Sequence, residues 1–453
     1  MTDPKPLSFL GRLGRTGRPL LPPLTPTELG QLALRAETRP GLLEEVESFL
    51  KALTPDDPHR DPELQFNDPC DLAETGWGVV FANGTPPEVR RSLQPLLVRR
   101  KEEAGTRYRE ITPEESVRRP GLVDPERYPY YVLVVGRPEE LSFEAVAEHD
   151  IQYAVGRLCF TKPSDPKTHD VEAYFRYVQN LESVESRPSR RSVAIFAPRE
   201  DKDEATVQLC DELMKPLLEK LGPALPRWRV QPAIAEAATY EALRGMLSKE
   251  VPGLLFTACH GLAHPCGDKD QLAEQGALFC QPDAEGPRCF TAADLPSGID
   301  LRGLISVHLT CFGLGTPEHD SFAPHQCGGG EKIAEGPFVA RLPQELLKAG
   351  ARAVVGHVDR AWTSNLHWPD KDNAASLWFG LLRHLGQGLP VGHALQLFGR
   401  GAADLAFKLN SLWKLRSQMK DVDPAEFARL WTSTEDAAGF QVLGDPAVRL
   451  NVD

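Results

Sequence analysis

Short apolar runs alternate with longer amphipathic stretches along most of this chain. In its first part, strands are predicted by apolar runs at 77–81, 130–136 and 152–158, and helices by amphipathic spacing over 87–102 and 142–149. After a charged, serine-rich stretch at 181–191 the alternation continues in a longer series. Strands are expected there at 192–196, 228–230, 253–256, 304–309 and 351–356, and helices over 205–221, 239–248, 338–349 and 372–420. Regular alternation of this kind predicts an α/β fold with a mostly parallel sheet flanked by helices.

These patterns divide the chain into three parts. Residues 1–65 are rich in proline and polar turns around one rough amphipathic stretch at 25–53, which predicts an N-terminal helical or irregular arm. The start of this arm, from Gly11 to Arg18, is rich in glycine and arginine and is expected to be flexible and solvated. Residues 66–190 are expected to form a smaller α/β subdomain, and residues 191–453 the main α/β domain.

Composition narrows the classes of function. The 453 residues carry a formal net charge of -13, which argues against direct binding to nucleic acid. Nine cysteines without the spacing of a disulfide framework fit a reducing cytoplasm better than secretion. The first residues contain no apolar signal-peptide core, and no apolar run approaches the roughly 20 residues of a membrane span. We therefore expect a cytoplasmic protein with no membrane partner. No phosphate-binding GxxxxGK[ST] run is present, and no cofactor is expected.

Two polar strings, each at the end of an apolar run, carry the candidate chemistry. His260-Gly261 follows the run 253–256, and Cys311 follows the run 304–309. The carboxyl ends of neighbouring parallel strands meet at one edge of a sheet, where open α/β proteins place their sites. A thiol beside an imidazole is an activated nucleophile, so Cys311 is the candidate nucleophile and His260 the candidate acid–base group. The amides of Gly261 and Cys311 are the candidate oxyanion donors, and glycine at 261 would let the backbone approach a substrate closely.

The alternative is that Cys311 is a small buried hydrophobe and His260 an ordinary core histidine, which is the usual interpretation of either residue alone. Three features together favour the dyad: both residues stand at strand ends, a glycine follows close behind each of them, and the two strings come in the expected order. A structural zinc site is disfavoured, since no paired CxxC knuckles are formed by the nearby candidates Cys259, His264, Cys266, Cys280 and Cys289.

On these strings, residues 128–453 resemble the caspase-like cysteine peptidases of the gingipain and CHAT type, in clan CD. The resemblance rests on His260-Gly261, on Cys311, on the string 347–356 and on the closing string 440–450 with its Leu-Gly-Asp-Pro. It implies a caspase–haemoglobinase fold, in which 66–190 is a pseudo-catalytic subdomain and 191–453 the catalytic domain. It also implies a thiol endopeptidase that cleaves a protein partner through an acyl-enzyme. Bacterial members inside the cell act in antiviral defence, where they cleave partners such as gasdermin-type pore formers.

The resemblance also places the pocket for the residue before the scissile bond between two loops. One loop follows the strand at 192–196 and holds Arg199, Glu200 and Asp201, and the other holds Asp359 and Trp362. Asp359 would select Arg or Lys by charge, and Trp362 would offer an apolar wall. Arg199 would instead favour an acidic residue, and solvated loop charges are the plainer alternative. We expect a preference for a basic or apolar residue over an acidic one.

Two other interpretations stay open beside the peptidase. One is a caspase-fold scaffold that has lost turnover. The other is an effector that is silent until an activating regulator binds, which is favoured by the long loops at 267–293 and 313–337, the latter with a glycine run at 328–330. No third catalytic group is assigned, because the histidine of this fold is oriented either by a backbone carbonyl or by an acidic side chain.

Overall fold

The computed structural model of this chain describes residues 11–13, 25, 66, 68–113, 123–184, 187–284, 286–320, 331–363, 374–418 and 420–452. The helix expected over 25–53 lies outside these residues except for Thr25, and the glycine run at 328–330 lies outside them entirely. No helix in this part of the chain is long and apolar enough to cross a membrane.

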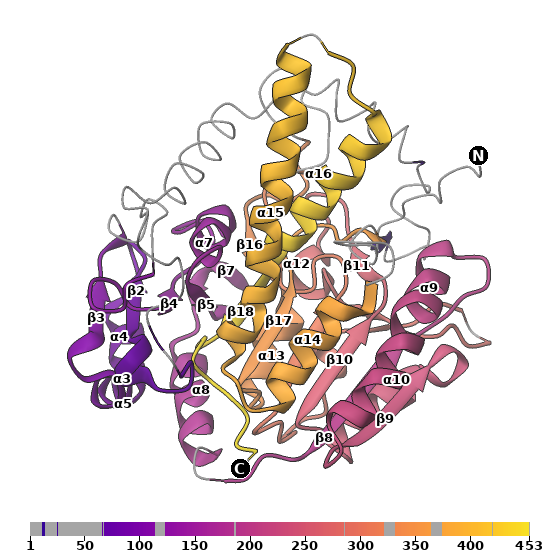
Figure 1. Ribbon diagram of the computed structural model, residues 1–453. Helices are drawn as coiled ribbons and strands as arrows, with labels where there is room; N and C mark the ends of the chain where they lie inside the picture. The colour runs from indigo at the N-terminus through magenta and orange to yellow at the C-terminus, as the bar shows by residue number, and fades with distance from the viewer. Residues whose placement is uncertain are drawn as a thin grey trace.

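One ten-stranded sheet runs through the molecule, and its strand order is β3-β2-β4-β5-β18-β17-β14-β10-β8-β9 (Figure 1). Neighbouring strands are parallel from β9 to β17 and from β5 to β3, and β18 is antiparallel to β17. In sheet order the strands are Tyr108–Ile111, Trp77–Phe81, Tyr131–Val135, Ala154–Leu158, Phe440–Gly444, Ala353–His357, Ile305–Leu309, Leu254–Ala258, Ser192–Ala197 and Arg229–Ile234. The predicted α/β class, with a mostly parallel sheet flanked by helices, is confirmed.

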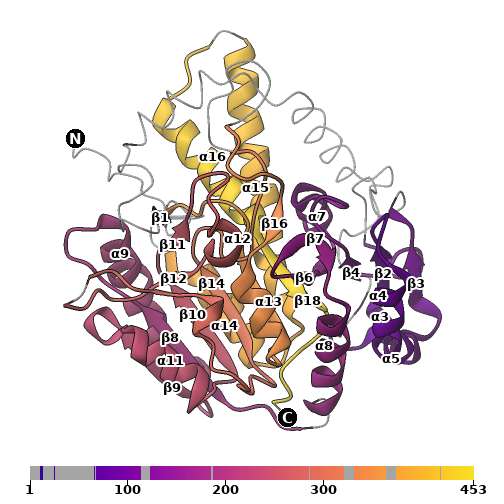
Figure 2. The ribbon, with the colours of Figure 1, turned by 180° about the vertical axis from the view of Figure 1, so that it is seen from behind.

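Helices flank the sheet, as the two opposite views show (Figures 1 and 2). Side-chain caps set where some of them begin: Ser142 Oγ accepts the Ala145 N–H at 3.1 Å, and Thr239 Oγ1 accepts the Ala242 N–H at 3.1 Å. The longer helices are α5 Gln94–Ala104, α7 Phe143–Asp150, α8 Val171–Val184, α10 Lys215–Ala224, α11 Tyr240–Ser248, α13 Arg341–Lys348, α14 Ala374–Gly386, α15 Val391–Ser417 and α16 Pro424–Gly439. The hairpin of α15 and α16 projects beyond the sheet and has a small core of its own around Leu405, Leu409 and Phe427 (Figure 1).

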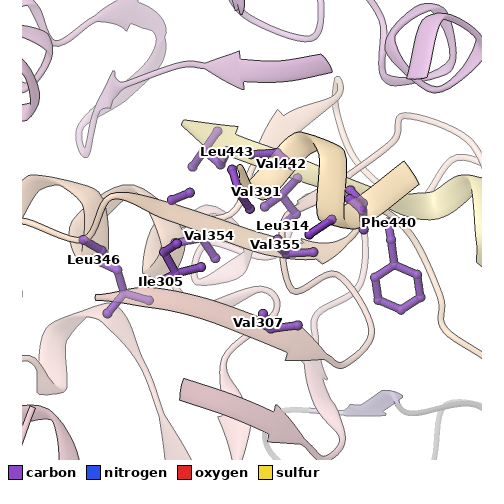
Figure 3. Close-up of a cluster of buried hydrophobic side chains, with 14 of the residues drawn as sticks. Ile305, Val307, Leu314, Leu346, Val354, Val355, Val391, Phe440, Val442 and Leu443 are labelled. Atoms are coloured by element: carbon purple, nitrogen blue, oxygen red, sulfur yellow. The ribbon is translucent and has the colours of Figure 1, made fainter. Parts of the chain in front are cut away.

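The hydrophobic core is continuous between the parts of the chain that the sequence separates at about residue 190. One cluster of buried side chains contains residues of every strand of the large sheet, from Trp77 near the start to Leu443 near the end. Figure 3 shows its centre, where aliphatic side chains of β14, β17 and β18 interdigitate with Leu314, Leu346 and Val391. Close packing of this kind couples the strands that carry the candidate site to the rest of the sheet.

Several boundaries differ from the prediction. The expected helix over 338–349 begins only at Arg341, because Phe338–Val339 pair as strand β16 with β15 Gly315–Thr316. The expected helix over 205–221 is interrupted by a π-helical turn at Leu209–Met214, between α9 Glu204–Gln208 and α10. Helices α8 and α16 are absent from the prediction. Amphipathic spacing predicts that a helix exists, but it does not locate the residue at which the helix begins or changes its geometry.

A buried carboxylate near the end of the chain binds side chains of the first α/β segment. Asp445, directly after β18, accepts the Trp77 Nε1–H at 3.0 Å and the Arg100 Nε–H at 2.8 Å. A second guanidinium nitrogen of Arg100 lies 2.8 Å from the same carboxylate, and Asp445 is completely buried. The Asp445 N–H donates to the hydroxyl of Tyr177 at 2.9 Å. The sequence motif predicts a tight turn here, and the turn exists, but its carboxylate also ties the first α/β segment to β18.

Asp445→Ala should destabilise the fold strongly, because it leaves the Arg100 guanidinium buried without its carboxylate. We expect a loss of about 3–5 kcal/mol in the free energy of unfolding, measured by urea denaturation. The matched control is Asp404→Ala, which removes an exposed carboxylate 2.7 Å from Lys408 on α15. That change should lower the free energy of unfolding by no more than about 0.5 kcal/mol. Equal losses in the two variants would contradict the role given to Asp445.

Candidate active site

The two strands that end at His260 and Cys311 are neighbours, as the sequence predicts. β10 and β14 pair in parallel, with Thr257 opposite His308 and Ala258 opposite Leu309. The Cys259 N–H donates to the Leu309 carbonyl at 3.2 Å, which carries the pairing beyond the end of β10. Extended by two residues, this register sets His260 opposite Cys311. The same register also makes the strings that follow the strands, 261–263 and 312–314, leave the sheet side by side.

Gly261 is required by the approach of Cys311. A Cβ at position 261 would lie 2.0 Å from the Cys311 carbonyl oxygen and 2.8 Å from Thr310 Oγ1, where no side chain fits. The close approach seen here is of the turn that carries Cys311, the candidate nucleophile. It holds the histidine strand and the cysteine turn against each other.

His260 is held by a carboxylate that the sequence does not single out. Its Nε2 lies 2.6 Å from Asp203 Oδ2, and the histidine side chain is 2% exposed. Its Nδ1 is buried and has no hydrogen-bond partner within the described residues. A carboxylate at Nε2 favours the tautomer with the proton on that nitrogen, which leaves Nδ1 with a free lone pair. Nδ1 is then the atom that can receive a proton.

Asp203 is placed by the turn between β8 and α9. Its N–H donates to the Glu200 carbonyl at 2.9 Å, and its own carbonyl accepts from Thr206 Oγ1 at 3.1 Å. Asp203 occupies the N-cap position of α9, yet its carboxylate makes no capping bond to that helix. An N-cap aspartate normally contributes about 1 kcal/mol through such a bond. Here the carboxylate turns to His260 instead, and an aspartate just before an apolar helical run is the sequence signal that points to this position.

The thiol of Cys311 is buried and faces a backbone loop. Sγ accepts the Ala361 N–H at 3.3 Å and lies 3.6 Å from the Ala361 carbonyl oxygen, and the residue has no exposed surface. Burial raises the pKa of this thiol well above its usual value, and the nearby carboxylates of Asp436 and Asp359 act in the same direction. The Ala361 N–H and the positive charge of Arg360 oppose that rise. No hydrogen bond joins the described side chains of His260 and Cys311, so the imidazole does not activate the thiol in this arrangement.

The turn after Cys311 is strained. Phe312 has φ +57° and Asp359 has φ +75°, and both are non-glycine residues in the left-handed region. The Phe312 N–H donates to the Asp359 carbonyl at 2.7 Å, which joins the two strained positions across the site. Conformations of this kind cost about 1–3 kcal/mol each, and they persist where the surroundings hold them.

The four residues proposed for the specificity pocket, Asp359, Trp362, Glu200 and Asp201, differ in burial and in their partners. Asp359 is buried, and its carboxylate accepts the Arg360 N–H at 2.8 Å. Trp362 is also buried, and its N–H lies 3.0 Å from both carboxylate oxygens of Asp436 on α16. Glu200 and Asp201 lie in the loop after β8 beside Asp203, where the exposed Asp201 pairs with Arg199. Specificity from these residues stays a prediction.

Ion pairs stiffen the loop at 359–362. The guanidinium of Arg360 is paired with the buried carboxylate of Asp320 and lies 3.9 Å from Asp359 Oδ1. Burial lowers the pKa of Arg360 to about 10. Together with Asp436, these groups position the Ala361 amide against the Cys311 thiol.

Within the described part of the chain, no three His, Cys, Asp or Glu side chains are grouped so that they could hold a metal ion.

Comparison with known proteins gives weak similarities only. No family model matches the chain, and no curated protein matches it. Among solved structures, the complex of the pro- and mature domains of RgpB from Porphyromonas gingivalis is 11% identical, with a TM-score of 0.42, over 83% of this chain and 80% of that one. Two structures of the Saccharomyces cerevisiae separase–securin complex are 11% identical over 92% of this chain, with TM-scores of 0.36 and 0.35. This chain covers 23% of the chain matched in each of those two structures. At these scores the similarities decide neither fold family nor activity.

The pH dependence of Cys311 alkylation follows from its burial. Because the pKa of Cys311 is raised in the folded state, its thiolate fraction at neutral pH is lower than in the unfolded chain. We expect carboxamidomethylation of folded protein at pH 7.5 to be at least about tenfold slower than in urea, and to rise only at strongly alkaline pH. Peptide-resolved mass spectrometry measures the rate, and Cys70, which is partly exposed, is the internal control. Equal rates at pH 7.5 would show that the thiol is already activated.

Proposed function

We propose that this chain is a caspase-like cysteine endopeptidase, of the caspase–haemoglobinase fold, in which His260 and Cys311 form the catalytic dyad. One observation carries the proposal. The register of β10 and β14 sets His260 opposite Cys311 at the carboxyl ends of adjacent parallel strands, with His260 Nε2 held by Asp203 and Nδ1 without a partner among the described residues.

In the proposed mechanism, His260 Nδ1 takes the proton of the Cys311 thiol, and the thiolate attacks the carbonyl carbon of the scissile peptide. The amides of Gly261 and Cys311 are the proposed donors to the oxyanion that forms. The C–N bond then breaks, and the leaving amine takes the proton from His260. Water, deprotonated by His260, hydrolyses the thioester and frees Cys311. Asp203 positions the imidazole and stabilises the imidazolium that each step produces.

The burial of Cys311 favours a regulated form of this activity. The thiol has no exposed surface, its pKa is raised, and it contacts Ala361 rather than His260. Attack on a peptide requires the turn at 311–313 or the loop at 359–362 to move. We therefore propose an effector that an activating regulator opens. A protein substrate in the cytoplasm, and a role in bacterial antiviral defence through a gasdermin-type partner, belong to the proposal on the sequence resemblance alone.

Wild type and Cys311→Ala, incubated with a peptide library and with candidate partner proteins, test the proposal. Mass spectrometry should show cleavage by wild type only, after basic or apolar residues more often than after acidic ones. Cys210→Ala is the matched control, because Cys210 is also a buried thiol and lies beside Ala197 and Pro198, away from the dyad. Cleavage that survives Cys311→Ala would refute the assignment of the nucleophile. Absence of cleavage in all three proteins, with and without candidate regulators, would favour the scaffold.

The role of Asp203 has its own test. Asp203→Asn should lower kcat about a hundredfold or more and leave KM within about twofold, because the carboxylate acts on the imidazole rather than on substrate. Asp201→Asn is the matched control, since it changes an exposed aspartate in the same loop whose partner is Arg199. Steady-state kinetics on the best library peptide measure both variants. A rise in KM with unchanged kcat would place Asp203 in substrate binding instead.

A further inference from the structure

The first ordered strand of the chain lies on the edge of the strand that follows His260. β1 Gly11–Leu13 pairs in parallel with β11 Gly261–Ala263, so that Gly11 is opposite Gly261 and Leu13 is opposite Ala263. On its other side β11 pairs with β12 Leu278–Phe279 (Figure 2). The four-stranded sheet has the order β1-β11-β12-β13, where β13 is Cys289–Phe290. The expected flexible, solvated arm is therefore ordered at residues 11–13, where it fills the outer edge of β11.

The hydrogen bonds of β11 show which backbone groups face this edge. The His260 carbonyl accepts the Phe279 N–H at 3.0 Å, and the Leu262 N–H donates to the Ala277 carbonyl at 2.9 Å. Both groups point toward β12. Because successive residues of a strand point their backbone groups to opposite sides, those of Gly261 and Ala263 point toward β1. In a parallel ladder of this register, Arg12 is the residue that donates to the Gly261 carbonyl and accepts from the Ala263 N–H.

This edge is next to the reacting pair. Gly261 is in contact with the Cys311 carbonyl and directly follows His260, and its amide is a proposed oxyanion donor. An extended peptide that binds to an exposed strand edge gains its affinity from main-chain hydrogen bonds of the kind that β1 makes here. A substrate that runs along β11 past Cys311 would need the backbone groups that residues 11–13 occupy.

We propose that residues 11–13 are an internal occupant of the peptide-binding edge of β11, and that they exclude substrate until they are displaced. The pairing of β1 with β11 is independent of the proposed function. The exclusion of substrate rests on that function. A three-residue edge strand makes few hydrogen bonds, so it can be displaced by a longer peptide or by a regulator that captures the arm. Because residues 11–13 belong to the same chain, they compete for this edge at a higher effective concentration than a free peptide of the same length.

The experiment compares Arg12→Pro with Gly11→Pro in the full-length chain. Proline at 12 removes the N–H that faces Gly261, whereas proline at 11 removes one that faces away from β11 and stands at the first residue of the strand, where proline is tolerated. We expect Arg12→Pro to raise amide exchange at Ala263, whose N–H faces the Arg12 carbonyl, at least tenfold, and to raise kcat/KM on a library peptide by a similar factor. Gly11→Pro should change neither quantity. A synthetic peptide of residues 8–16, added at millimolar concentration, should reverse both effects of Arg12→Pro, and a scrambled peptide should not.

Two results would overturn the inference. Unchanged exchange at Ala263 in Arg12→Pro would show that residues 11–13 do not protect this edge. Raised exchange without any gain in binding or cleavage of the library peptide would show that the edge is not where the peptide binds. Binding is measured by fluorescence anisotropy in the Cys311→Ala background. A catalytically silent chain would therefore still show the binding gain, and failure of the inference is distinguished from failure of the proposed peptidase.

Discussion

The buried carboxylate of Asp445 is the interaction on which the arrangement of the sheet depends. It is completely buried, binds Trp77 from β2 and Arg100 from α5, and directly follows β18, which separates β5 from β17. A charge in such a place is tolerated only when it is paired and hydrogen-bonded on every side. This requirement fixes the two parts of the sheet in one geometry relative to each other. A shift of β18 by one residue would take the buried carboxylate away from both Trp77 and Arg100.

Buried, paired groups also surround the candidate site, where they hold the loop that covers the Cys311 thiol. Asp436 binds the Trp362 N–H, Asp320 binds Arg360, and between them the Ala361 amide is aimed at Cys311. These contacts hold Phe312 and Asp359 in left-handed conformations that neither residue favours. A loop kept in strain by many neighbours tends to have two arrangements rather than a continuum, since release of one contact weakens the hold of the others. The buried thiol and the edge of β11 covered by β1 are the two observations behind the proposed closed arrangement.

Much of this structure could be predicted from periodicity, and the failures have physical causes. Apolar runs located the strands of the main domain within a few residues, because buried parallel strands are apolar on both faces. The position of His260 and Cys311 at the ends of two adjacent strands could be predicted from the order of the apolar runs that precede them. Asp203 did not follow, because three carboxylates lie within four residues of that loop, and only the turn closed by Thr206 decides which one reaches His260. The burial of Cys311 and the pairing of β1 depend on contacts between residues far apart in sequence, which no local pattern contains.

The central place of β18 has a consequence for biosynthesis. All other strands of the ten-stranded sheet precede it in the chain, yet it lies between β5 and β17. While the chain is still on the ribosome, both parts of the sheet therefore present an unpaired, apolar edge until residues 440–444 emerge. Long-range pairing of this kind is slow, and open edges of this kind are prone to wrong association. A chain interrupted before its last strand would be left with two parts of a sheet, each with an exposed apolar edge, rather than with one smaller domain. Protection by chaperones during synthesis would therefore matter more here than for a fold whose strands pair in the order in which they are made.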